Sequence, residues 1–153
     1  MISFNLNEQI YRPLKQVFGF VSTPENDFQW QYGTLGSAKL SEGTIGKGSV
    51  FRTIGHFMGR RIESTYEVTE FEPYKKYGFR SLTGPIHSHT IFTFEVFAGS
   101  TRVNITTEAN PGDLFETSDG IVEKKAKKQY KENLALLKHV LETSQVERFT
   151  KET

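Results

Sequence analysis

The spacing of apolar residues changes along the chain, from every second position in most of it to every third or fourth near its end. From residue 120 to about 144 the apolar residues have helical spacing, which places them along one side of a single long α-helix. They are Val122, Ala126, Tyr130, Leu134, Leu137, Val140 and Leu141. Lysines occupy most of the other side. A helix with one apolar stripe needs a surface that covers the stripe.

The middle of the chain predicts that surface. Apolar and polar residues alternate there, as they do on strands whose side chains point to two faces in turn. Six strands are expected, at residues 34–41, 49–57, 61–71, 77–83, 86–97 and 102–108. In the strand at 86–97, the inward face is expected to carry Ile86, Thr90, Phe92, Phe94 and Val96. Short connections with Gly and Pro between consecutive strands predict an antiparallel meander.

The first thirty residues predict one more strand and two short helices. Residues 3–10 alternate with the mixed faces of a strand at a sheet edge. Pro13 and Pro24 suit the first turn of a helix, because a backbone N–H has no partner there. We therefore predict an α+β fold, a seven-stranded antiparallel sheet around a long C-terminal helix. Residues 1–144 are expected to form one domain, and residues 145–153 a polar C-terminal tail.

Several stretches resemble the polyketide cyclase/dehydrase and lipid-transport family of the START-like superfamily (SRPBCC). The matching residues are Val17-Phe18, Pro24-Glu25-Asn26-Asp27, Trp30, Gly46-Lys47-Gly48, Phe51-Arg52, Gly59-Arg60-Arg61, Thr65-Tyr66-Glu67-Val68-Thr69-Glu70, Phe79-Arg80-Ser81 and Thr93-Phe94-Glu95. The resemblance extends over about residues 2–141. It implies a helix-grip fold, with a cavity between the sheet and the C-terminal helix that holds an apolar small molecule.

Aromatic residues supply the expected wall of that cavity. The chain has thirteen Phe against one Trp and two Met, and Phe suits both a packed core and an apolar cavity. We expect a volume of several hundred Å³, the usual scale for small-molecule sites. The predicted ligand-binding residues are Phe18, Trp30, Phe51, Tyr66, Phe79, Phe92, Phe94, Tyr130, Asn133 and Leu137.

The favoured function is binding or carriage of a small hydrophobic molecule that is lipid-, polyketide- or isoprenoid-like. One alternative is an enzyme of the polyketide aromatase/cyclase type that acts in the same cavity. Another is a protein-interaction role in which side chains fill the cavity. The sequence leaves the identity of the ligand and the oligomeric state open.

Two polar residues are placed among apolar ones. Asn133 lies on the apolar side of the long helix, and Tyr66 lies on the inward strand face with Ile62, Ser64 and Val68. A buried amide without a partner costs about 1–3 kcal/mol, so a protein group, a water or a ligand must satisfy it. Pairing within the protein, for example between Asn133 and Tyr66, is slightly favoured over contact with a ligand.

Charge and composition exclude other classes. A net charge of +1 argues against a nucleic-acid partner, because such domains are usually strongly basic. The chain has no Cys, and no apolar run approaches the roughly 18 residues of a membrane span. The first eight residues lack a basic and an apolar signal region, so a cytoplasmic location is expected. The lysines at 124–131 suit a solvated helix face, and transient contact with anionic membrane lipid is a minor alternative.

Candidate metal, phosphate and catalytic motifs are weak. His87 and His89 share one strand face, but zinc needs a third ligand and that face points outward. Residues 43–49 are glycine-rich and contain Lys47, but a strand follows them where a phosphate loop requires a helix. The sequence shows no catalytic triad motif. We therefore expect no metal and no cofactor, and identify no catalytic residue.

Overall fold

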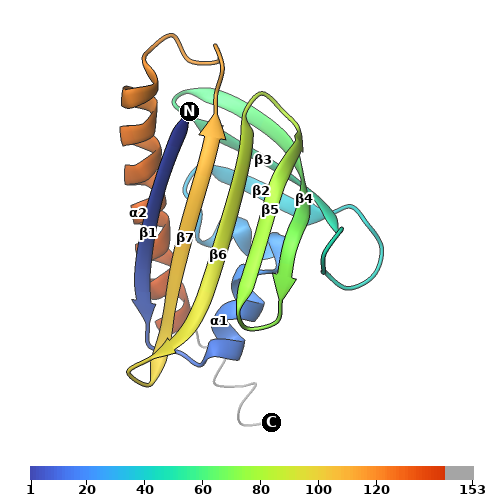
Figure 1. Ribbon diagram of the computed structural model, residues 1–153, viewed down its shortest axis with the longest axis vertical. Coiled ribbons are helices and arrows are strands. Elements are labelled where there is room, and N and C mark those ends of the chain that lie inside the picture. Colours follow the sequence, from blue (N-terminus) through green and yellow to red (C-terminus); the bar gives the residue numbers. More distant parts are fainter. Residues whose placement is uncertain (144–153) are drawn as a thin grey trace.

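The structure, a computed structural model, describes residues 1–143 (Figure 1). The predicted tail at 145–153 lies outside the described residues. In chain order the elements are β1 (Ile2–Ile10), α1 (Leu14–Val21), the 3₁₀ helix η1 (Pro24–Gln29), β2 (Thr34–Lys39), β3 (Val50–Phe57), β4 (Arg60–Glu72), β5 (Lys76–Thr83), β6 (His87–Phe97), β7 (Ser100–Asn110) and α2 (Asp119–Glu142). The predicted α+β class, seven strands and long helix are confirmed.

All seven strands form one antiparallel sheet in the order β1-β7-β6-β5-β4-β3-β2. The strands from β2 to β7 make the predicted meander, and β1 adds to β7 along its full length, from Ile2 opposite Ala109 to Ile10 opposite Thr101. Irregular pairing in β2 and at two places in β4 bends the sheet, because a bulge increases local twist. The sheet therefore curls, and its concave face can surround a ligand-sized space.

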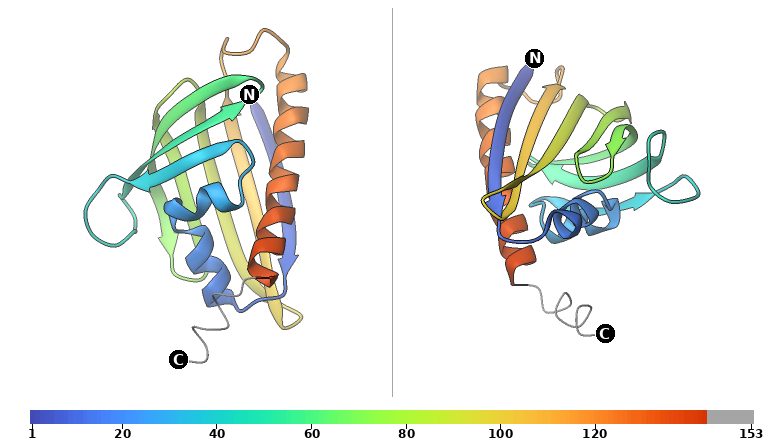
Figure 2. Two further views of the ribbon diagram at one scale, coloured as in Figure 1. Left: turned by 180° about the vertical axis from the view of Figure 1, so that it is seen from behind. Right: turned by 60° about the horizontal axis from the view of Figure 1, so that its bottom comes forward.

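Helices close the concave side of the curled sheet. Figure 2 shows α2 running beside β1, with α1 and η1 covering the lower end of the concave side, next to the C-terminal end of α2. The Ser118 side chain caps α2 by accepting a hydrogen bond from the Ile121 N–H. The buried residues of α2 are Val122, Asn133, Leu134, Leu137 and Leu141. Its lysines at 124, 125, 127, 128 and 131 are all exposed on the other side, as amphipathic spacing predicts.

Within residues 1–143, none of the helices combines the length and apolar character needed to cross a membrane.

Two packed clusters form the core. The larger one joins α1, Trp30, the C-terminal half of α2 and the middle strands, whereas the smaller one joins β1, Phe115 and the first turns of α2. The candidate site lies between these clusters.

Candidate functional site

A cavity of about 210 Å³ lies between the concave face of the sheet, α2 and the segment from Trp30 to Thr34. It is smaller than the several hundred Å³ expected from sequence, because aromatic side chains occupy much of the space. An apolar cavity of about 150 Å³ holds a benzene ring, so this one has room for a ligand of one or two rings. Side chains leave this space open, whereas the protein-interaction alternative requires them to fill it.

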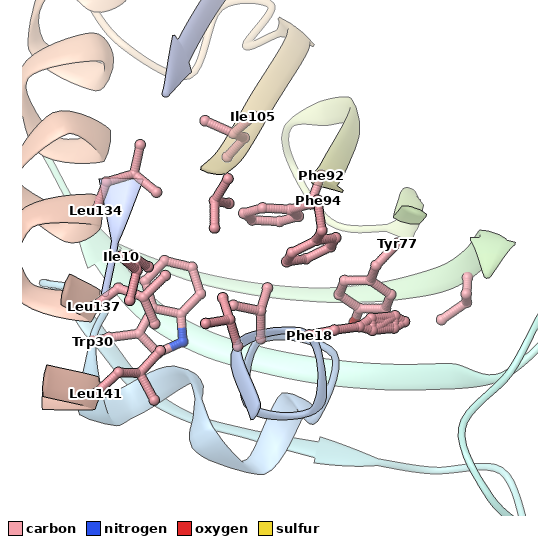
Figure 3. Packing of buried hydrophobic residues seen from close by; sticks show 14 of the residues in the cluster. Ile10, Phe18, Trp30, Tyr77, Phe92, Phe94, Ile105, Leu134, Leu137 and Leu141 are labelled. Carbon is pink, nitrogen blue, oxygen red and sulfur yellow. The ribbon is translucent and has the colours of Figure 1, made fainter. Parts of the chain in front are cut away.

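Seven of the ten predicted binding residues line this cavity: Trp30, Phe51, Tyr66, Phe79, Phe92, Tyr130 and Asn133. Their part in ligand binding stays a prediction. The other three lie in the larger packed cluster (Figure 3). There the Phe18 ring meets the Phe94 ring edge-on, with centroids 5.1 Å apart, and Leu137 is fully buried. The fold places α1 against this end of the sheet, so these three residues pack against protein rather than line the cavity.

The aromatic wall is held by ring contacts. Phe51 stacks on Tyr66 with centroids 5.3 Å apart, and Phe79 meets Phe51 edge-on at 5.2 Å. Trp30 meets Phe92 at 6.1 Å. Such pairs are worth about 0.5–1.5 kcal/mol beyond their buried area, so the wall is largely preformed. The indole nitrogen of Trp30 is buried without a hydrogen-bond partner among the described residues. Figure 3 shows that this nitrogen points toward α1, the helix that carries Phe18.

Asn133 holds the rim of the cavity. Its Oδ1 accepts a hydrogen bond of 2.8 Å from the Tyr32 backbone N–H. One turn earlier on α2, the Gln129 side chain donates to the Tyr32 carbonyl. The next residue, Gly33, has a φ of +85°, and a Cβ there would lie 2.5 Å from the His56 carbonyl oxygen. The partner of Asn133 is thus a protein group, as favoured from sequence, but it is the Tyr32 backbone rather than Tyr66.

A buried acid, Asp27, lines the cavity and was not among the predicted site residues. Desolvation raises the pKa of its carboxyl well above the ordinary value. The nearby Ser37 hydroxyl opposes this shift, and the charge of Glu25 adds to it. Burial therefore favours the neutral acid, which can donate a hydrogen bond. The sequence shows the residue within Pro24-Glu25-Asn26-Asp27 but not that η1 turns it inward.

Hydroxyl groups form the other polar part of the cavity. Burial raises the pKa of the Tyr66 hydroxyl, while the neighbouring Ser64 and Ser88 hydroxyls act against the rise. Thr90 and Thr107 pair with each other across β6 and β7 at 3.1 Å. Ser64 lies on the strand face that the sequence predicts to point inward. The sequence feature that could have identified it as a site residue is its position as a polar residue on an otherwise mostly apolar face.

His56 lies at the edge of this cavity, and the other histidines do not line it. His87 is exposed, and the Nε2 of His89 lies 3.2 Å from the Thr69 hydroxyl and 3.5 Å from a Glu70 carboxylate oxygen. In the described part of the chain, no three His, Asp or Glu side chains are grouped so that they could hold a metal ion.

Comparison with known proteins gives both sequence and structural matches. A family model described as polyketide cyclase/dehydrase and lipid transport matches residues 1–142. No curated protein matches the sequence. A START superfamily protein from Mycobacterium smegmatis is similar in structure, with a TM-score of 0.79 and 15% identity over 92% of this chain and 97% of that one.

Two further solved structures share the fold. The protein TTHA0849 from Thermus thermophilus has a TM-score of 0.74 and 18% identity, over 93% of this chain and 99% of that one. The di-domain ARO/CYC BexL from the BE-7585A biosynthetic pathway has a TM-score of 0.70 and 18% identity, over 93% of this chain and 47% of that one. At these identities the likeness shows the helix-grip fold alone.

Proposed function

The chain belongs to the polyketide cyclase/dehydrase and lipid transport family, and from that premise we propose that it binds and carries a small hydrophobic molecule in the cavity between the sheet and α2. The observation that supports this most is the cavity of about 210 Å³, left open beside a closely packed core. Its wall is mainly aromatic and aliphatic. Each Å² of apolar ligand surface that moves from water into the cavity therefore contributes about 25 cal/mol of favourable binding free energy.

A filling substitution tests this proposal. Ala126 is a half-buried residue of α2 that lines the cavity, whereas Ala135 lies on the exposed side of the same helix. Ala126→Phe should occupy part of the space and exclude a ligand, and Ala135→Phe is the matched control. Native mass spectrometry of freshly purified protein should show a co-purified small molecule with wild type and Ala135→Phe. Equal ligand occupancy in Ala126→Phe would place the binding site elsewhere.

A polyketide aromatase/cyclase-type enzyme is the second candidate, and Asp27 is the observation that favours it. A neutral carboxyl in an apolar cavity is suited to donate a proton to a carbonyl oxygen. Asp27→Asn keeps the shape and removes the acid. Conversion of the co-purified molecule to a product of another mass by wild type, but not by Asp27→Asn, would favour the enzyme over the carrier. An unchanged mass in both would favour the carrier.

A further inference from the structure

A band of hydroxyl groups crosses the concave face of the sheet. Strand register places Ser37 opposite Thr53, and Thr53 in turn opposite the inner residue Ser64, so three neighbouring strands each contribute one hydroxyl to the same row. Thr90 opposite Thr107 continues the band on β6 and β7. Facing partners in a sheet point to the same side, which here is the side of the cavity.

Most of this band is satisfied within the protein. The Ser37 and Thr53 hydroxyls lie 3.0 Å apart, and those of Thr90 and Thr107 lie 3.1 Å apart. Ser64 differs: the residue is only 4% exposed and lines the cavity, and its Oγ forms no hydrogen bond of ordinary geometry among the described residues. The Tyr66 hydroxyl is close enough for Ser64 to oppose the rise in its pKa, so the two hydroxyls together form one polar point on the cavity wall. An unpaired buried hydroxyl costs free energy that a ligand atom can recover.

Charge restricts what that ligand atom can be. Among the described residues, those that line the cavity include no lysine and no arginine, Asp27 is the one acid, and the one histidine, His56, is exposed at the edge. A carboxylate or phosphate placed against the inner wall would lose its water without gaining a lysine or arginine partner, which is strongly unfavourable. Hydroxyl groups both donate and accept, so they suit a neutral oxygen or nitrogen.

We propose that the cavity selects neutral ligands of one or two rings that carry a hydrogen-bonding group, with Ser64 as the specificity-determining residue, and that it rejects carboxylates of the same size. The polar group of the ligand faces Ser64 and Tyr66, and its ring face lies against α2. This inference rests on the proposed function, because it names the class of molecule that the same cavity takes.

Three probes of one shape test the inference by isothermal titration calorimetry at pH 7: 2-naphthol, naphthalene and 2-naphthoate. A phenol is neutral at this pH, whereas the carboxylate is ionised. We expect 2-naphthol to bind more tightly than naphthalene, and 2-naphthoate to bind at least about ten-fold more weakly than 2-naphthol. Ser64→Ala should weaken 2-naphthol by about 3- to 10-fold and leave naphthalene unchanged. Ser3→Ala, on the exposed face of β1, is the matched control.

The outcomes separate this inference from the proposed function. Naphthoate binding as tightly as naphthol, or Ser64→Ala leaving naphthol affinity unchanged, would overturn the inference while a ligand still occupies the cavity. Equal affinity for naphthol and naphthalene would do the same. If none of the three probes binds wild type at its solubility limit, both the inference and the carrier function are contradicted.

Discussion

Replacing Asn133 by Leu tests how α2 holds the rim of the cavity. The change removes the acceptor of the Tyr32 N–H, a bond of 2.8 Å between residues 101 positions apart in sequence. A buried donor that loses its acceptor costs about 1–3 kcal/mol of stability. The lower half of that range applies here, because Tyr32 is 51% exposed and water can reach it. Leu has the better helix propensity, which returns at most about 0.7 kcal/mol. The net destabilisation is expected to be about 0.5–1.5 kcal/mol.

For a chain of this length that loss corresponds to a fall in Tm of about 1–6 °C. Thermal unfolding followed by circular dichroism would measure it. Asn133→Asp keeps an acceptor at the same place, so comparing it with Asn133→Leu isolates the effect of the lost hydrogen bond. Lys131→Leu, on the exposed side of α2, controls for the effect of adding an apolar residue to the helix. A Tm of Asn133→Leu equal to or above that of wild type would contradict this expectation, since it would mean that the Tyr32 contact contributes nothing to stability.

Other substitutions have distinct expected results. Because burial raises the pKa of Asp27, folded protein holds its proton over a pH range in which unfolded protein releases it, so stability should fall as pH rises from about 4 towards the folded-state value. Urea titrations at several pH values give the free energy of unfolding as a function of pH. In wild type its downward slope should approach about 1.4 kcal/mol per pH unit, and Asp27→Asn should remove this slope. The same slope in both proteins would contradict the burial of this acid. Leu137→Ala, at a fully buried position outside the cavity lining, should cost about 2–5 kcal/mol by urea denaturation and leave 2-naphthol affinity unchanged. A loss of affinity there would place Leu137 in the binding site.

The sequence was sufficient to predict the architecture. A long amphipathic repeat and six alternating segments allow few arrangements, because each apolar face must be covered by another. Strand and α2 ends lie within about two residues of those predicted, a normal uncertainty for element boundaries. The faces of Phe51, Tyr66, Phe79 and Phe92 follow from strand alternation alone.

The limits of the cavity could not be predicted in the same way. Alternation tells which face a side chain takes, but not how far along that face the open space extends. Phe94 faces inward yet packs on α1, and Val96, assigned inward, is 66% exposed beside the β6–β7 turn. Asp27 and the Asn133 contact depend on how η1 and the following loop meet α2, which is a long-range feature of the fold.

A small neutral molecule is proposed to bind between the sheet and α2. A titration of ¹⁵N-labelled protein with 2-naphthol, followed by two-dimensional NMR, tests it most directly. We expect saturable shifts at the backbone amides of the cavity wall, above all Phe51, Tyr66, Phe92 and Thr107, with little change at the exposed lysines of α2. Shifts confined to the outer surface, or none at the solubility limit of the probe, would contradict it.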